Sequence, residues 1–245
     1  MKYPISIVAL SILSFTTSFG GNFPEEAWGA GYLRDVPRAI DYVDSQTPGL
    51  VLEPPPEDDS ETTASEIERL KRLSKTRHSK DIILIHKESL DPLKRFFEVL
   101  GVSREEVPNL DFLIRHIAEE SYLPILYFKH KFSRIRPYHL DTNLITVIDG
   151  PPHPSYPSGH ATQGFLVASL LADLLPDCDP RNERVLELGK EIGIRREIAG
   201  VHYPSDTAAG IALAKQLKPL LLEKPAFQKA FKAAKSELSS IQLSH

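Results

Sequence analysis

The chain has 245 residues, a mass of 27.4 kDa and 29 Lys and Arg against 33 Asp and Glu, for a formal net charge of −4. Hydrophobic residues make up 41% and charged residues 25%, the proportions of a globular protein with a sizeable core, which excludes disordered, collagen-like and disulfide-scaffold classes. The slight acidity also argues against a nucleic-acid polymer as partner, because such proteins present an excess of Lys and Arg to the phosphates.

The N-terminus has the pattern of an export signal. A single charge, Lys2, precedes an apolar stretch over residues 5–15 that is too short to span a bilayer as a helix. Together with the triplet Ser18-Phe19-Gly20, this pattern is typical of a signal peptide, residues 1–20, cut after Gly20; the alternatives are a buried helix or an uncleaved anchor. No other stretch reaches membrane-spanning length, so we expect a periplasmic or secreted protein without stable membrane insertion.

The rest of the chain divides into an arm and a domain. Residues 21–63 are rich in proline, glycine and acidic residues, which predicts an extended arm. Over residues 64–245 apolar residues recur at helical spacing after a capping-box signal at Thr63 and Glu66, and alternating strands are absent. This pattern predicts an all-α fold, a single-domain helical bundle. Cys178, the only cysteine, lies in a polar turn where we expect it to be exposed.

Charged and polar residues interrupt the apolar stripes of two predicted helices near the C-terminus. Asp179 and Pro180 open a helix whose inward positions lead to Arg196, and a guanidinium there needs an anion, either a structural carboxylate or a ligand. Asp206 opens the stripe of the next helix, and His202 precedes it by four residues. Such a pair either fixes the tautomer of the imidazole and raises its basicity, or is a helix cap beside a core histidine.

Two further segments carry groups suited to an anion. Ser158 is the predicted N-cap of a helix that begins at Gly159, where backbone N–H groups lie at the positive end of the helix dipole and His160 faces inward. Lys129 lies on an apolar helix face, and Arg136 precedes a proline that restricts its backbone. Together these groups predict a pocket for a tetrahedral oxyanion such as phosphate. A metal held by the two histidines and the aspartate is the weaker alternative, because the neighbouring cations would repel it.

The order and spacing of these residues resemble the three-part signature of the type 2 phosphatidic acid phosphatase and vanadium haloperoxidase superfamily. The three segments are Lys129, six residues, Arg136-Pro137; then Pro157-Ser158-Gly159-His160; then Arg196, five residues, His202, three residues, Asp206. The segment Leu52–Ser60, the predicted signal peptide and the length are most similar to the bacterial class A non-specific acid phosphatases. One position departs from the family pattern: Arg195 stands where serine is usual, and we expect it to be exposed because it is one residue off the inward stripe.

The resemblance implies a metal-independent acid phosphatase that acts on small phosphomonoesters with broad specificity and has no cofactor, so that vanadate would bind only as a phosphate mimic. It implies that His202 attacks phosphorus to form a phosphohistidine, that Asp206 orients it, and that His160 protonates the leaving alcohol, which predicts an acid pH optimum. The other matched residues are expected to hold the phosphoryl oxygens: Lys129, Arg136, Ser158, Gly159 and Arg196.

Three alternatives use the same pocket. A vanadate-dependent haloperoxidase would hold vanadate as a cofactor bonded to His202, although such enzymes are usually much longer than this chain. A lipid phosphate phosphatase would be expected to carry membrane helices, and a non-catalytic phosphate-binding module would have to keep both histidines and the aspartate without using them. Contacts to the leaving group are expected from the arm and from residues 130–156, where Tyr138, His139, His153 and Tyr156 are candidates of equal standing. The physiological substrate, phosphotransferase or diphosphatase activity, and a homo-oligomeric state stay open.

Overall fold

The computed structural model describes residues 22–242, so the predicted signal peptide lies outside the described part. Within that part the chain is helical without a β-strand, which confirms the predicted all-α fold, and none of its helices is both long and apolar enough to cross a bilayer. The helices are η1 (Glu25–Ala27), α1 (Ala30–Gln46), α2 (Glu61–Thr76), α3 (Ser79–Leu90), α4 (Lys94–Leu100), α5 (Pro108–Phe132), α6 (Pro137–Leu140), α7 (Gly159–Leu174), α8 (Arg181–Ile198), α9 (Pro204–Glu223) and α10 (Pro225–Gln242).

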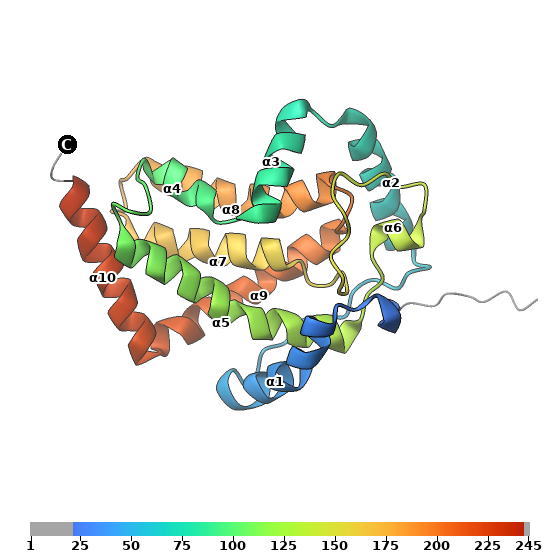
Figure 1. Ribbon diagram of the computed structural model, residues 1–245, viewed down its shortest axis with the longest axis horizontal. Coiled ribbons are helices and arrows are strands. Elements are labelled where there is room, and N and C mark those ends of the chain that lie inside the picture. The colour runs from blue at the N-terminus through green and yellow to red at the C-terminus, as the bar shows by residue number, and fades with distance from the viewer. Residues whose placement is uncertain (1–21, 243–245) are drawn as a thin grey trace, which may run out of the picture.

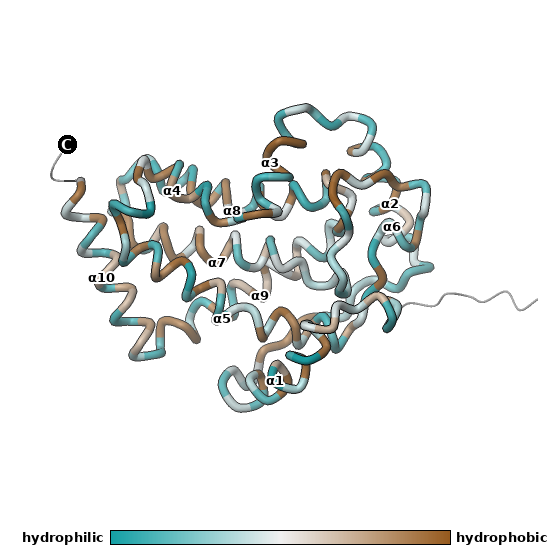
Figure 2. Tube along the Cα trace, in the orientation of Figure 1, coloured by the Kyte–Doolittle hydropathy of each residue, from teal (hydrophilic) through white to brown (hydrophobic). Residues whose placement is uncertain are grey.

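Helix α7 lies at the centre of the bundle, with α5, α8 and α9 packed around it (Figure 1). Its residues are apolar on nearly all sides and most of them are buried, as expected for a helix that is surrounded by others. Helix α10 covers α5 and α9 with a single apolar face that includes Phe227, Ala234 and Leu238, and Figure 2 shows brown, hydrophobic segments between teal ones along it. The packing of α7 against α5, α8 and α9 positions its N-terminal end, where Ser158 and Gly159 of the predicted site lie.

Glycines allow α8 and α9 to approach α7 closely. A Cβ on Gly189 of α8 would lie 2.8 Å from the carbonyl oxygen of Gly164 in α7. A Cβ on Gly210 of α9 would lie 2.7 Å from the carbonyl oxygen of Ser158. Side chains do not approach backbone atoms this closely, so larger residues at these positions would push the helices apart. Because Ser158 directly precedes α7, the same packing sets the geometry of the predicted site.

The prediction of an extended N-terminal arm is wrong for Ala30–Gln46, which form α1. Val36, Ala39 and Val43 are spaced three to four residues apart and are buried, and the helix packs along α5. This apolar face outweighs the proline and glycine content that favoured an extended chain. Between α1 and α2, residues 51–57 have no regular secondary structure, as the proline-rich sequence predicts.

Helix α2 begins before the predicted capping box. Ser60 is the N-cap, and its Oγ accepts a hydrogen bond from the Thr63 N–H at 3.2 Å. The side chains of Thr63 and Glu66 instead contact the Arg134 guanidinium, at 3.4 and 3.2 Å. The residues predicted to start the helix therefore belong to a buried polar network beside the site.

We predict that Gly189→Ala destabilises the protein by about 1–3 kcal/mol, because the added methyl group has no space between α7 and α8. The matched control is Gly31→Ala in α1, where a Cβ would have nothing within 4 Å. There the higher helix propensity of alanine should raise stability by about 0.5–1 kcal/mol. Urea unfolding of both variants measures the two effects, and equal stabilities would show that α7 and α8 do not pack as tightly as described.

Candidate active site

A cavity of about 170 Å³ opens at the N-terminal end of α7 and is bordered by α5 and by the turn before α9. Four predicted site residues line it: Lys129, Gly159, His160 and His202. His153, from the loop that precedes α7, lines it as well. The structure thus brings together groups from each of the three segments of the sequence signature.

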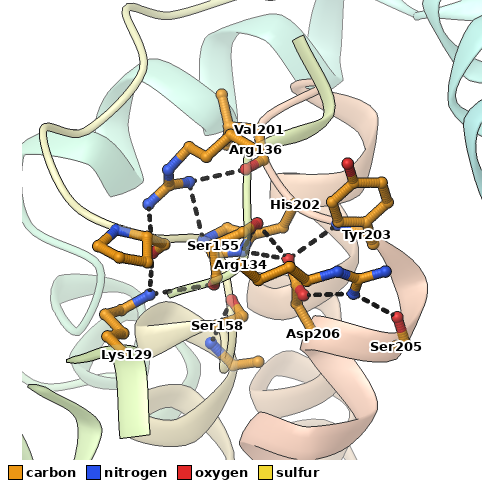
Figure 3. A network of polar contacts seen from close by, with 12 residues as sticks. Lys129, Arg134, Arg136, Ser155, Ser158, Val201, His202, Tyr203, Ser205 and Asp206 are labelled. Carbon is orange, nitrogen blue, oxygen red and sulfur yellow. Dashed lines mark hydrogen bonds and ion pairs between the residues drawn. The ribbon is translucent and has the colours of Figure 1, made fainter. Parts of the chain in front are cut away.

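His202 and Asp206 form the hydrogen-bonded pair that their spacing predicts. The His202 Nδ1 lies 2.9 Å from the Asp206 Oδ2 (Figure 3), and because a carboxylate only accepts, this nitrogen carries the proton. The same oxygen accepts hydrogen bonds from the Tyr203 N–H and from the Ser155 hydroxyl, a contact that the sequence did not predict. The His202 Nε2 keeps its lone pair and lies 3.3 Å from a guanidinium nitrogen of Arg136. Burial and Arg136 lower the pKa of His202 well below its usual value, so its ring stays neutral in weak acid.

Lys129 and Arg136 are buried cations whose hydrogen bonds go mainly to backbone carbonyls. The Lys129 Nζ donates to the carbonyl oxygens of Pro154 at 2.8 Å and Ser155 at 3.0 Å, which leaves one of its three N–H groups for a ligand. Arg136 donates to the carbonyl oxygen of His153 at 2.9 Å and to two others. Neither cation has an ion pair with a carboxylate in the described part of the chain. Burial lowers the pKa of Lys129 well below its usual value and that of Arg136 to about 10.

Arg134 was not among the predicted site residues, yet it holds the site aspartate in place. It is fully buried, with one nitrogen 2.8 Å from the Asp206 Oδ1 and another 3.2 Å from a carboxylate oxygen of Glu66. Its guanidinium also packs over the Tyr203 ring, 3.9 Å from the centroid. Burial alone would raise the pKa of Asp206, but Arg134 and His202 lower it below its usual range. The carboxylate therefore stays ionised and keeps its hold on His202.

Arg195 and Arg196 share one buried carboxylate. Glu88 of α3 is fully buried and lies 2.6 Å from a nitrogen of Arg195 and 3.3 Å from one of Arg196. The prediction that Arg195 is exposed is wrong: only 5% of it is exposed, because α3 covers this face of α8 and supplies the counter-ion. Arg196 also donates to the Ser89 hydroxyl at 3.1 Å, so α3 holds its guanidinium and it does not line the cavity.

His160 lies between the cavity and α3. Its Nε2 lies 3.2 Å from the Glu88 carbonyl oxygen, an acceptor that places a proton on this nitrogen and leaves Nδ1 to exchange a proton with a ligand. Burial and the charge of Arg196 lower the pKa of His160 to about 3. An anion bound in the cavity would raise this pKa, because it would offset the surrounding positive charge.

Ser158 and Gly159 begin α7 as predicted. The Ser158 hydroxyl accepts a hydrogen bond from the Ala161 N–H at 3.4 Å, and the Ser158 N–H donates to the Asp206 carbonyl oxygen at 3.0 Å. Gly159 lines the cavity, so the positive end of the α7 dipole borders it. The side chain of Ser158 thus caps the helix, and its backbone joins α7 to α9.

Of the four candidates for leaving-group contacts, His153 lines this cavity. Tyr156 is buried in the core and donates to the Glu53 carbonyl oxygen at 2.6 Å. The rings of Tyr138 and His139 pack against each other, 4.6 Å apart between centroids, and do not line the cavity. His153 is thus the member of this group that a ligand would meet.

The metal alternative requires His160, His202 and Asp206 to converge on one ion. Asp206 instead accepts the His202 Nδ1–H, and His160 is bonded to the backbone of Glu88. In the described part of the chain no group of three or more His, Cys, Asp or Glu side chains is arranged to hold a metal ion.

Residues 117–217 match the family model described as the PAP2 superfamily, a range that contains every predicted site residue. The chain is 29% identical over 154 residues to a non-specific acid phosphatase of Providencia stuartii, an alignment that covers 60% of this chain and 61% of that protein. It is 32% identical over 143 residues to an acid phosphatase of Zymomonas mobilis, covering 57% and 53% of the two chains. The chain therefore spans somewhat more than half the length of these curated relatives. Among solved structures, a bacterial vanadium-dependent iodoperoxidase has the same fold, with a TM-score of 0.53 and 16% identity over 72% of this chain and 52% of that chain.

We predict that Arg134→Met destabilises the protein by about 3–5 kcal/mol, because it leaves the carboxylates of Asp206 and Glu66 buried without their counter-ion. The control is Arg115→Met, which removes an Arg–Asp pair on the surface of α5, where 60% of the Arg115 side chain is exposed. That change should cost at most about 0.5 kcal/mol. Chemical denaturation measures both, and losses of equal size would contradict the role given to Arg134.

Proposed function

We propose, from the premise that residues 117–217 form a PAP2 superfamily domain, that the protein is an acid phosphatase that hydrolyses small phosphate monoesters. The observation that carries the proposal is the hydrogen-bonded pair of His202 and Asp206 beside a cavity that the buried Lys129 lines, with the buried Arg136 3.3 Å from the His202 Nε2. Neither cation has a carboxylate partner in the described part of the chain. The names of the two relatives, both acid phosphatases, support it. Export to the periplasm or the medium is part of the proposal and rests on the sequence of residues 1–20 alone.

In the first half of the reaction, Nε2 of His202 attacks phosphorus from the side opposite the leaving group. The bond between phosphorus and the leaving oxygen breaks, and His160 transfers the proton on its Nδ1 to that oxygen, so that an alcohol departs and a phosphohistidine remains. Asp206 keeps Nδ1 of His202 protonated, which aims the lone pair of Nε2 and stabilises the positive charge that the ring acquires.

In the second half, water attacks the phosphohistidine. His160, now neutral, accepts a proton from this water while the P–N bond breaks, and inorganic phosphate leaves with His202 returned to its neutral form. Both half-reactions use protein groups and water as proton carriers, which is the basis for proposing that the enzyme is independent of a metal.

Lys129, Arg136 and the N-terminus of α7 are proposed to stabilise the phosphoryl oxygens. Uncatalysed phosphate monoester hydrolysis is among the slowest reactions known, with accelerations up to about 10²¹-fold, so strong charge stabilisation is required. Arg196, held by Glu88, acts on the site through its field. Because that field and burial lower the pKa of His160 to about 3 in the free enzyme, activity should be highest in acid and fall as pH rises through the pKa of His160 in the complex.

The haloperoxidase alternative would place vanadate, an oxyanion of the same shape, in this cavity. The likeness to the iodoperoxidase concerns the fold alone, whereas both sequence relatives are named acid phosphatases, so phosphatase activity is the better supported proposal. An assay of halide oxidation with peroxide and vanadate, run beside the phosphatase assay, distinguishes the two.

Hydrolysis of a lipid phosphate much faster than that of soluble monoesters would favour the lipid phosphatase alternative.

We predict that His202→Ala lowers the hydrolysis of 4-nitrophenyl phosphate by roughly 10⁴-fold or more, because it removes the nucleophile. His130→Gln, at an exposed position of α5 outside the cavity, is the control and should keep wild-type activity. A chelator should leave the wild-type enzyme unchanged. Activity that a chelator removes and a divalent metal restores would contradict the mechanism.

A further inference from the structure

Part of the active-site cavity has an aromatic and aliphatic lining. Tyr32 of α1 forms this part together with Tyr122, Ile125 and Leu126 of α5. Apart from the histidines, Lys129 is the one side chain that is charged near neutral pH among the described residues that line the cavity, and Gln163 adds an uncharged amide. A ligand here therefore meets positive charge where the phosphoryl group binds and uncharged side chains beyond it.

We call this part of the cavity, formed by Tyr32, Tyr122, Ile125 and Leu126, the wall. One contact each fixes the positions of its two tyrosines. The Tyr32 ring lies edge-on to His153, with centroids 4.7 Å apart and an interplanar angle of 71°. The Tyr122 hydroxyl donates to Asp35 of α1 at 2.9 Å, which ties α1 to α5. At the start of α1 the Gly29 N–H donates to the Pro152 carbonyl oxygen at 2.8 Å. The wall is therefore built into the fold, and its position depends on α1.

The size of the cavity limits what can bind beside the phosphoryl group. Its volume is about 170 Å³, and an apolar cavity of about 150 Å³ in another protein holds one benzene ring. A phosphoryl group together with part of one ring fills this space, and the remainder of the leaving group would extend through the opening.

A second depression borders His160 and has a different character. It measures about 550 Å³ and has a mixed lining, in which His86, Ser89, Thr146 and Asp149 lie beside Val147 and Ile148. Neither Lys129 nor His202 lines it, so it does not adjoin the nucleophile. A leaving group that departs from phosphorus opposite the nucleophile could extend to either side of His160, and the two sides favour different chemistry.

We propose that Tyr32 and Tyr122 select substrates whose leaving group is an apolar or aromatic alcohol of about one ring, in preference to polyols and charged groups; this inference rests on the proposed phosphatase function. A ring packs favourably against these side chains, edge-on or offset. A sugar or a second phosphate would lose water there without gaining hydrogen bonds from Ile125 or Leu126, which disfavours its binding.

The test compares kcat/KM for phenyl phosphate and glycerol 1-phosphate in the wild type and in Tyr32→Ser. We expect the ratio of the two values to fall about tenfold in Tyr32→Ser, through phenyl phosphate, because the variant loses one aromatic contact. Tyr32→Phe keeps the ring and should keep the wild-type ratio. Comparing ratios between variants removes the difference in intrinsic reactivity of the two leaving groups.

Two controls separate selection from damage to the fold. The inhibition constant of inorganic phosphate should be the same in Tyr32→Ser and wild type, because phosphate alone does not reach the wall. Asp149→Asn, in the second depression, should not change the substrate ratio. If Tyr32→Ser does not fold, Tyr32→Gln, which retains most of the bulk without the ring, is measured in its place.

An unchanged ratio in the Tyr32 variants, with or without a shift in Asp149→Asn, would overturn the inference while leaving the proposed phosphatase intact. A wild type that turns over neither substrate contradicts the proposed function, and the inference fails with it. Turnover by the wild type therefore distinguishes a failure of the selectivity inference from a failure of the proposed phosphatase function.

Discussion

Burying a positive charge without a negative partner lowers the stability of a protein, and this one buries two such charges side by side. Lys129 and Arg136 are almost completely shielded from water, and their hydrogen bonds go mainly to backbone carbonyls. Carbonyl dipoles offset only part of the loss of hydration. Burial lowers the pKa of both groups, because it disfavours their charged forms. A bound dianion would supply the negative charge that these two cations lack. The arrangement of ion pairs around the site can be understood from this requirement.

The buried arginines next to Lys129 and Arg136 do have carboxylate partners, and their role is to hold other residues in place. Arg134 is paired with Asp206 and Glu66, and Arg196 with Glu88. These ion pairs do not line the cavity, but their carboxylate residues orient the two histidines that do. Asp206 sets the tautomer of His202, and the backbone of Glu88 does the same for His160. The fold therefore sacrifices stability at Lys129 and Arg136, where a ligand is expected, a trade-off typical of active sites.

Much of this arrangement could be predicted from the sequence, because helical periodicity fixes which residues share a face. The inward positions of Asp206 and Arg196 and the helix start at Ser158 follow from spacing and capping alone. Which cation in residues 129–136 is structural does not follow, since Arg134 and the exposed Lys131 look alike until the tertiary fold buries one of them.

Two further features depend on contacts between segments distant in the sequence. Glu88 pairs with Arg195 and Arg196 only because α3 packs on α8, so the sequence gives no sign that Arg195 is buried. The cavity wall likewise depends on the packing of α1 along α5. Helix α1 lies in the segment whose prolines and glycines led us to predict an extended arm. Local patterns predict helices and faces, whereas counter-ions and cavity walls are set by the tertiary structure.

The thermal stability of Lys129→Met, compared with wild type in the absence and presence of inorganic phosphate, tests the central claim most directly. Without phosphate, we predict that the variant is about as stable as wild type, because removing a buried charge without a carboxylate partner offsets the loss of the hydrogen bonds from Nζ to the carbonyl oxygens of Pro154 and Ser155. With phosphate at 100 times its Kd, wild type should gain about 2.7 kcal/mol, a rise in Tm of several degrees, and the variant little or nothing. A variant that is clearly less stable than wild type without phosphate, or one that phosphate stabilises equally, would contradict the claim.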